Sequence, residues 1–330
     1  MARADLLKKL FTSHKAGDNE GFLRVANDII EDEQKKNHGV LAYELKAILN
    51  GSAQPKRAFS TYSANLSKDK DNGLALFEIM YPEKFLTDFV TTPQMQQEFE
   101  KIIKEFQNWD VLVSNGASPT RRVLFYGAPG CGKTLAAQAI ASEIGLPMIY
   151  VRFDAVISSY LGETATNLRK VFDFARGDNY LIFFDEFDAI ARSRNDSFEH
   201  GEIKRVVNTF LQQLDNFKGK SLIIAATNFE RSLDYAIWRR FDGTLRFDMP
   251  SNEEKQKLFS LRLNSLKGAD HVLAEYFVEL EGFSYADIEQ VANTVRKQCI
   301  LEGRKIYTKQ DVENAVFRHK EIVSLRKTQY

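Results

Sequence analysis

The chain has little of what marks a secreted or membrane-spanning protein. Only two cysteines, Cys131 and Cys299, occur among its 330 residues, which argues against a disulfide framework and indicates a reducing compartment. The segment Met1–Phe11 is charged and has no unbroken apolar run, so it is neither a signal peptide nor a membrane span. We therefore expect a cytoplasmic protein without a membrane partner.

Net charge and repetition are also missing. Lys plus Arg and Asp plus Glu both number 45, so the formal net charge is zero, and no overall field favours nucleic acid as a partner. The sequence contains no internal repeat and no low-complexity segment. The composition, with 44% hydrophobic and 27% charged residues, is that of an ordinary globular chain of about two domains.

The most informative stretch is Gly127–Thr134, which has the G-x-x-x-x-G-K-T spacing of a phosphate-binding loop. An apolar run, Val123–Tyr126, precedes it and a helical pattern follows it. Glycines let the loop turn its N–H groups towards a phosphate chain, and the helix adds the positive end of its dipole. Lys133 can reach the β- and γ-phosphates, and the Thr134 hydroxyl can hold Mg²⁺. The predicted nucleotide contacts are Gly127, Ala128, Pro129, Gly130, Cys131, Gly132, Lys133 and Thr134.

Carboxylates and an amide follow two further apolar runs. Residues 181–184 lead directly into Asp185 and Glu186. Asp185 can support the metal ion, and Glu186 can polarise the attacking water as a general base. Asn228 follows the run 223–226, where its side chain could orient that water. Together with the phosphate loop, these residues predict hydrolysis of a nucleotide.

Two adjacent arginines, Arg239 and Arg240, lie just before a predicted strand. The sequence gives them no local role. They suit arginine fingers, which stabilise transition-state charge at the site of a neighbouring subunit. Because a finger that acts in trans needs a neighbour at every site, this interpretation predicts a ring.

From Arg121 onwards the pattern alternates between apolar strands and helices. This pattern predicts an α/β fold, with a mostly parallel sheet covered by helices on both faces. The phosphate loop would lie at the carboxyl edge of the sheet, where such folds bind ligands. The candidate strands are Val123–Tyr126, Met148–Phe153, Tyr180–Phe184, Ser221–Ala226 and Leu245–Met249.

Helical segments flank the α/β domain, which we place at residues 81–250. Residues 1–50 predict a bundle of three short helices, either a packing appendage or, as we favour, a docking module. Residues 51–80 are expected to be a linker, and residues 251–330 an all-helical domain. The helices expected there are Glu253–Leu266, Val272–Leu280, Ala286–Leu301 and Lys309–His319.

With these motifs in place, over about residues 85–320, the chain resembles the AAA family of ATPases. It is most similar to the branch that includes the microtubule-severing enzymes, the ESCRT-disassembly ATPase and the ATPases of proteasomes. The resemblance implies a P-loop NTPase domain followed by a helical lid. It identifies Walker A as Gly127–Thr134, Walker B as Asp185 and Glu186, sensor 1 as Asn228, and the arginine fingers as Arg239 and Arg240.

Two motifs of the family occur here with a glycine replaced. Leu214–Phe217 matches the inter-subunit signalling segment, but Asn216 stands in place of its glycine. Gly282–Asp287 matches the lid segment that closes over the nucleotide, but Tyr285 stands in place of its second glycine. The nucleotide contacts that the resemblance adds are Asp88, Phe89 and Val90 at the adenine pocket, and Ser284 and Ala286 in the lid.

Tyr160, Leu161 and Gly162 follow the second predicted strand and match the family's first pore loop, which grips a threaded polypeptide. An exposed Tyr-Leu pair would also intercalate well with the side chains of an extended peptide. Asn195–Glu202 corresponds to the second pore loop.

The resemblance implies an enzyme that needs ATP and Mg²⁺ and acts as a homo-hexamer that remodels, unfolds or threads protein substrates. Its catalytic residues would be Lys133, Glu186, Asn228, Arg239 and Arg240, and its metal-binding residues Thr134 and Asp185. The segment Lys36–Leu41 adds a weaker resemblance to compact bacterial AAA ATPases that serve a separate subtilisin-like serine protease, including toxin–antitoxin-like and defence pairs. This chain itself contains no protease motif.

Two alternatives remain open at this point. One is a DNA-directed AAA+ ATPase such as a helicase loader, which the zero net charge and the Tyr-Leu-Gly loop disfavour. A DNA-directed ATPase would show ATP hydrolysis that is stimulated by DNA and that falls steeply as the salt concentration rises. The other is a nucleotide-gated scaffold with little turnover, which Glu186 disfavours because it supplies a general base.

Overall fold

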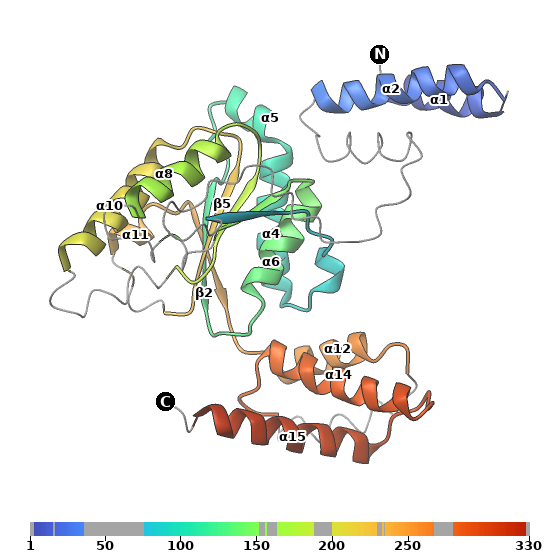
Figure 1. The fold of residues 1–330 in the computed structure, drawn as a ribbon, viewed down its shortest axis with the longest axis vertical. Helices are drawn as coiled ribbons and strands as arrows, with labels where there is room; N and C mark the ends of the chain where they lie inside the picture. The colour runs from blue at the N-terminus through green and yellow to red at the C-terminus, as the bar shows by residue number, and fades with distance from the viewer. Residues whose placement is uncertain are drawn as a thin grey trace.

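The computed structural model of the chain describes residues 3–15, 17–35, 76–151, 156, 164–187, 200–229, 233, 235–266 and 280–327. At the N-terminus, helices α1 (Arg3–Lys15) and α2 (Asn19–Lys35) lie against each other as a hairpin (Figure 1). The expected third helix and most of the expected linker, residues 36–75, lie outside the described residues.

The middle of the chain forms one sheet of six strands in the order β1-β3-β4-β5-β2-β6. The strands are β1 (Phe77–Met80), β2 (Arg122–Gly127), β3 (Met148–Val151), β4 (Leu181–Phe184), β5 (Leu222–Thr227) and β6 (Gly243–Phe247). Strand β2 pairs in parallel with β5 and β6, and β4 pairs in parallel with β3 and β5. The expected mostly parallel sheet is therefore confirmed.

The sheet begins earlier in the chain than the sequence suggested. Strand β1 occupies the last four positions of the expected linker and pairs antiparallel with β3, with Phe77 opposite Val151. Phe77 is fully buried, whereas the next three residues of β1 are partly exposed. A four-residue edge strand that is buried at one position has too little periodicity to be recognised.

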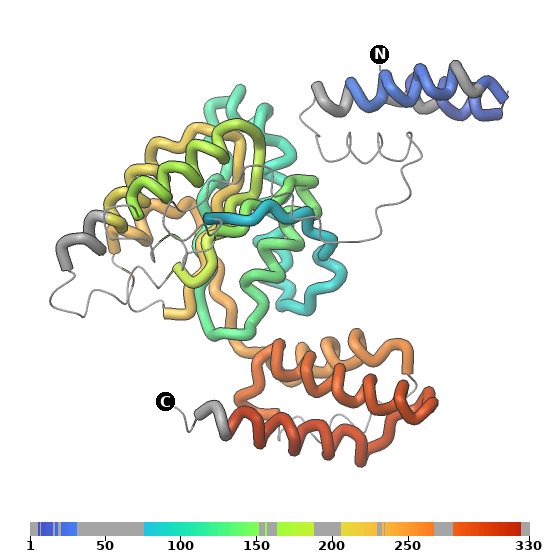
Figure 2. The backbone as a smooth tube through the Cα atoms, in the orientation of Figure 1, coloured from blue at the N-terminus to red at the C-terminus, as the bar shows by residue number. Residues whose placement is uncertain are grey.

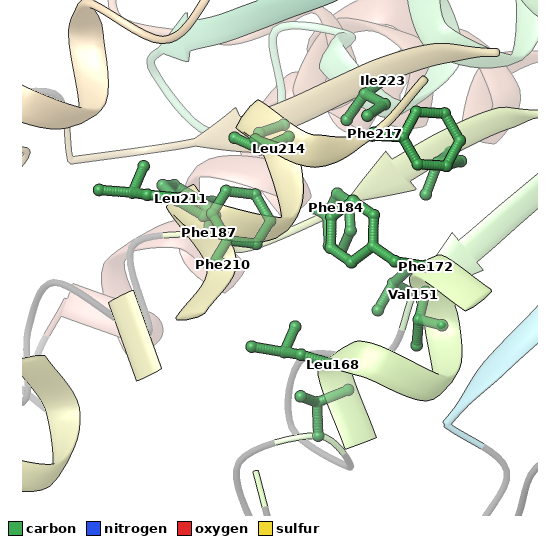
Figure 3. Close-up of a cluster of buried hydrophobic side chains, with 14 of the residues drawn as sticks. Val151, Leu168, Phe172, Phe184, Phe187, Phe210, Leu211, Leu214, Phe217 and Ile223 are labelled. Atoms are coloured by element: carbon green, nitrogen blue, oxygen red, sulfur yellow. The ribbon is translucent and has the colours of Figure 1, made fainter. Parts of the chain in front are cut away.

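Helices cover both faces of the sheet, as predicted (Figure 1). On one face lie α8 (Thr164–Ala175) and α10 (His200–Asn216), and on the other α4 (Pro93–Gln107) and α6 (Lys133–Ile144). Neighbouring residues of β4 point to opposite faces, as the two-residue period of a strand requires. Phe184 packs on Phe172 of α8 and Phe210 of α10 (Figure 3), whereas Phe183 belongs to the core on the α4 and α6 side.

A separate helical unit follows β6 and packs around its own core (Figure 2). It contains α12 (Asn252–Arg262), α14 (Tyr285–Leu301) and α15 (Lys309–Lys327). Capping boxes fix the starts of two helices, with Ser251 and Glu254 at α12 and Ser284 and Asp287 at α14. The helix expected at 272–280 falls almost entirely outside the described residues.

Several element boundaries differ from the expected ones. Strand β6 starts at Gly243 rather than Leu245, α12 ends at Arg262, and α15 continues beyond His319 to Lys327. A short helix, α5 (Trp109–Ser114), follows α4 and was not expected. In the described part of the chain, no helix is long and apolar enough to cross a membrane.

Candidate active site

The phosphate loop connects the end of β2 to the start of α6, as the sequence predicted. Gly132 caps α6 with a φ of +92°, and a Cβ atom there would lie 2.7 Å from Cε2 of Phe89. A larger residue would therefore meet both backbone strain and a steric clash. The helix starts at Lys133, so its first N–H groups face the loop.

The Lys133 side chain is held inside the loop. It is only 7% exposed, and its ammonium group donates to the backbone oxygens of Gly127 at 2.8 Å and Ala128 at 2.9 Å. These two contacts keep the positive charge beside the loop N–H groups. The loop therefore presents a preformed cationic cradle that suits phosphate oxygens.

Asp185 accepts three hydrogen bonds, two from other elements and one from the next residue. Its Oδ2 accepts from the Thr134 hydroxyl of α6 at 2.9 Å and from the Tyr150 hydroxyl of β3 at 3.2 Å. Its Oδ1 accepts from the backbone N–H of Glu186 at 2.9 Å. The hydroxyl of Thr134 and the carboxylate of Asp185 are hard oxygen ligands, so this donor set fits Mg²⁺.

Tyr150 is a site residue that the sequence reasoning missed. It lies in the short apolar strand β3, where a tyrosine is most simply explained as core. Its ring does pack there, 5.8 Å from the ring of Phe183. The hydroxyl at its tip reaches Asp185 only because β3 and β4 are neighbours in the sheet.

Glu186 has an unusual backbone conformation. Its φ of +51° makes it the only non-glycine residue with positive φ in the described part of the chain. Such a conformation is costly for a residue with a side chain and persists when its surroundings fix it. The next residue, Phe187, helps to fix the backbone at Glu186. Phe187 is fully buried, and its N–H donates to the Ala226 oxygen at 2.8 Å.

These groups open onto one cavity of about 400 Å³, which lies within the usual range for small-molecule sites. The phosphate-loop residues from Pro129 to Leu135 form one wall. The rest of the lining comes from both the α/β unit and the helical unit. It consists of Asp88, Phe89, Val90, Asp185, Glu186, Asn228, Leu258, Arg262, Tyr285, Ala286 and Glu289.

The start of α14 touches the phosphate loop directly. The N–H of Ala286 donates to the Gly130 oxygen at 3.0 Å. Gly130 has a φ of +72°, and a Cβ atom there would lie 2.6 Å from the Ser284 hydroxyl oxygen. Ser284 itself does not line the cavity; its hydroxyl donates to Asp287 at 2.6 Å as part of the helix cap. The helical unit is thus in contact with the loop at a position that requires glycine.

Comparisons with known proteins agree with this geometry. Residues 123–249 match the family model described as "ATPase family associated with various cellular activities (AAA)". The chain is 42% identical over 316 residues to an uncharacterized AAA family ATPase of Sinorhizobium fredii, covering 96% of this chain and 95% of that protein.

The chain belongs to the AAA family of ATPases.

Further relatives carry names linked to proteolysis. A homologue of a 26S proteasome regulatory subunit from Methanocaldococcus jannaschii is 30% identical over 296 residues, covering 84% of this chain and 78% of that protein. A proteasome-activating nucleotidase of Saccharolobus islandicus is 36% identical over 209 residues, covering 61% of this chain and 53% of that protein. The matched family and these names establish an ATPase with a P-loop NTPase domain.

In this AAA ATPase, the two arginines do not line the cavity of the chain that carries them. Arg240 donates from Nε to Oδ2 of Asp215 at 3.3 Å and from Nη1 to the Ala236 oxygen at 2.8 Å. Arg239 is exposed, and its guanidinium lies 5.2 Å from the ring centre of Tyr235. Neither arginine lines the cavity described above.

The two replaced glycines of the AAA motifs occupy different environments. Asn216 is the last residue of α10, next to Phe217, which is buried in the core. Tyr285 lines the cavity, and its hydroxyl donates to Oε1 of Glu254 at 2.7 Å. Burial, followed by the hydrogen bond to Glu254, raises the pKa of Tyr285 far above its ordinary value, so the phenol keeps its proton.

Cys131 behaves as a small buried residue of the loop. It is 2% exposed, and its Sγ lies 3.6 Å from Sδ of Met249. Burial raises the pKa of the Cys131 thiol, and the nearby Lys133 charge only partly opposes this effect. A thiol that keeps its proton is a poor nucleophile, so nothing here favours redox control.

The pore-loop residues Tyr160, Leu161 and Gly162 lie outside the described residues, as do residues 195–199 of the second loop. Of the remaining predicted contacts, Asp88, Phe89, Val90, Asn228 and Ala286 all line the cavity. The lining residues that were not predicted as contacts are Leu135 of α6, Leu258 and Arg262 of α12, and Tyr285 and Glu289 of α14.

Proposed function

We propose that this AAA ATPase is a Mg²⁺-dependent homo-hexamer that uses ATP hydrolysis to unfold, thread or remodel polypeptide substrates. The observation that carries the proposal is the position of Arg239 and Arg240, which are away from the cavity of their own subunit. Such arginines suit completion of a neighbour's site. The proteasome-linked names of two relatives support a polypeptide substrate.

In this mechanism the phosphate end of the cavity binds and polarises ATP. Lys133 would exchange its two carbonyl contacts for β- and γ-phosphate oxygens. Thr134 and Asp185 would hold Mg²⁺, which would supply neutralisation of phosphate charge when bound. Glu186 takes a proton from the attacking water, which the Asn228 amide orients. Arg239 and Arg240 of the adjacent subunit stabilise charge on the γ-phosphate.

Movement would begin at the contact between α14 and the phosphate loop. Ala286 bonds to Gly130, so a change in the loop on loss of the γ-phosphate would be transmitted to the helical lid, 251–330. The lid would then shift the α/β domain of the next subunit, and with it the Tyr160-Leu161-Gly162 loop that we assign to substrate grip.

We assign residues 1–50 to partner docking. The described helices α1 and α2 form their own hairpin, apart from the cores of the α/β and lid units. A separate serine protease is the partner that the N-terminal resemblance favours. Deletion of residues 1–50 should then abolish co-purification with the partner while leaving basal ATP hydrolysis unchanged.

The first test is the mass in solution of Glu186→Gln, with and without ATP and Mg²⁺. Loss of the general base should trap bound ATP, so small species should convert to hexamers when ATP is added. Lys133→Ala, which cannot hold the phosphates, is the control that should remain small. A Glu186→Gln protein that binds ATP and stays a monomer at every concentration would contradict the ring.

A further inference from the structure

An ion pair between two helices of the helical unit lines the cavity. Nε of Arg262 on α12 is 2.8 Å from Oε1 of Glu289 on α14, and both side chains line the cavity. The Arg262 side chain is 20% exposed and the Glu289 side chain 41%. Both side chains line the cavity, so a ligand bound there could contact them.

Helical spacing places this pair one turn beyond the phosphate contacts. Arg262 follows Leu258 by four residues, and Glu289 follows Tyr285 by four, so each pair lies on one face of its helix. Ala286 contacts the phosphate loop, and one helical turn advances about 5 Å. Glu289 therefore lies about one helical turn along α14 from the residue that contacts the phosphate loop, a spacing similar to that between the phosphates and the sugar of a nucleotide.

The chemistry of Glu289 suits hydroxyl groups rather than phosphate, because it presents a negative carboxylate to the cavity, whereas Lys133 supplies positive charge at the loop. A carboxylate accepts hydrogen bonds and cannot donate them, so Glu289 suits the hydroxyl groups of a ribose. The same use of a carboxylate occurs in dinucleotide-binding folds.

Arg262 also has unused hydrogen-bonding capacity. Its Nε is buried, and although the Glu289 oxygen is close, the geometry does not make a hydrogen bond; within the described residues this N–H has no acceptor. A buried donor without an acceptor is costly unless a ligand supplies one. A polar ligand bound in the cavity would supply the missing acceptor.

We propose that Glu289 accepts a hydrogen bond from a ribose hydroxyl of the nucleotide, and that Arg262 positions the Glu289 carboxylate for this contact. The protein then distinguishes ribonucleotides from deoxyribonucleotides. This inference rests on the nucleotide site proposed above and adds a specificity-determining residue to it. Glu289 contacts the substrate, and Arg262 is a positioning residue.

The test compares kcat/KM for ATP, 2′-deoxyATP and 3′-deoxyATP in the full-length wild type and in Glu289→Ala. The wild type should prefer ATP over one of the deoxy analogues by about tenfold, since the analogue cannot make the charge-assisted hydrogen bond to the Glu289 carboxylate. Glu289→Ala should reduce this preference to about twofold or less. Arg262→Ala should also reduce the preference for ATP over the deoxy analogue, and the change should appear in KM rather than in kcat.

The matched control is Glu302→Ala. Glu302 also pairs with an arginine, Arg304, just after the end of α14, but does not line the cavity. It should keep the wild-type preference. A folded Glu289→Ala protein with an unchanged preference, or a wild type that treats all three nucleotides alike, would overturn the inference. Failure of the wild type to bind ATP by calorimetry would instead overturn the nucleotide site itself.

Discussion

At the scale of single residues, the structure separates the two adjacent arginines that the sequence could only treat as a pair. Arg240 donates hydrogen bonds to Asp215 and to the Ala236 oxygen of the same chain. Arg239 is exposed and rests on the Tyr235 ring, which is itself 71% exposed. We infer that Arg239 acts as the arginine finger at a neighbouring site. Arg240 would also stabilise residues 235–240, the segment that carries Arg239.

The prediction is that Arg239→Ala and Arg240→Ala differ in stability although both lose activity. Arg239→Ala should lower kcat by about 100-fold or more with an unchanged melting temperature. Arg240→Ala should also lower the melting temperature, because Asp215 loses a partner. Steady-state kinetics and thermal melts of each variant, with exposed Arg296→Ala as the control, measure the difference. Identical melting behaviour in both variants would refute the division of roles.

Tyr150 gives a second prediction at this scale. Its hydroxyl is one of two side-chain donors to Oδ2 of Asp185. Tyr150→Phe keeps the ring in the core and removes the hydroxyl that donates to Asp185, so Mg²⁺ affinity should fall by about threefold to tenfold while the fold is preserved. Titration of ATPase activity with Mg²⁺ checks this, and Tyr126→Phe is a control outside the cavity. An unchanged Mg²⁺ midpoint would show that Tyr150 is only a core residue.

At the scale of elements, the turn between α14 and α15 depends on one buried carboxylate. Asp311 accepts two hydrogen bonds from the Arg304 guanidinium, each at 2.8 Å, and further bonds from the N–H and hydroxyl of Thr308. The Arg304 bonds lower the pKa of Asp311 far below its ordinary value of 3.8, although burial opposes them. The carboxylate therefore stays charged in the folded lid.

This lowered pKa predicts acid sensitivity of the lid. A carboxyl group with a depressed pKa contributes stability that is complete above its unfolded-state value and is lost as the pH falls towards its folded-state value. The Asp311 contribution should therefore be constant above about pH 5 and decline below about pH 4. Asp311→Asn should lower the melting temperature at pH 7 by about 4–8 °C.

Calorimetry of Asp311→Asn between pH 3 and pH 7 measures the effect. The variant should lose less stability than the wild type on acidification, since the titrating group is gone. Asp110→Asn is a suitable control, because Asp110 pairs with Lys220 on the surface, with its side chain 86% exposed. Parallel pH profiles for wild type and Asp311→Asn would contradict the assignment.

At the scale of the whole molecule, Tyr285 joins the two large units. Its ring packs against the core on the α4 and α6 face of the sheet and also against the lid core, and its hydroxyl binds Glu254 of α12. In the AAA family a glycine is usual at this position, and a glycine could make none of these contacts. The tyrosine therefore couples the lid to the α/β domain more tightly than the common motif would.

The prediction is that Tyr285→Gly uncouples the two units. Calorimetry should resolve a separate, earlier transition of the lid, and KM for ATP should rise, because the lid no longer holds its position over the cavity. Tyr285→Phe retains the ring and should lie between wild type and Tyr285→Gly. A single unchanged transition in Tyr285→Gly would show that the ring does not couple the units.

The sequence by itself determined the elements whose signals are local. Gly127–Thr134 has its spacing because a loop around phosphate needs glycines at fixed intervals, and the helix start at Lys133 follows from the same segment. The strands after Arg121 could be recognised because buried parallel strands are continuous apolar runs. The positions of Asp185 and Asn228 at one sheet edge followed from the common direction of parallel strands.

Only the tertiary structure decided the contacts between segments distant in the chain. Nothing in the local pattern indicates that Tyr150 reaches Asp185, that Arg262 meets Glu289, or that Arg240 is held by Asp215. Each of these contacts depends on which strands are neighbours or on how two helices pack. The side-chain periodicity of one element does not show which other element packs against it. The edge strand β1 was missed for the same reason, since its pairing with β3 rather than its own composition makes it a strand.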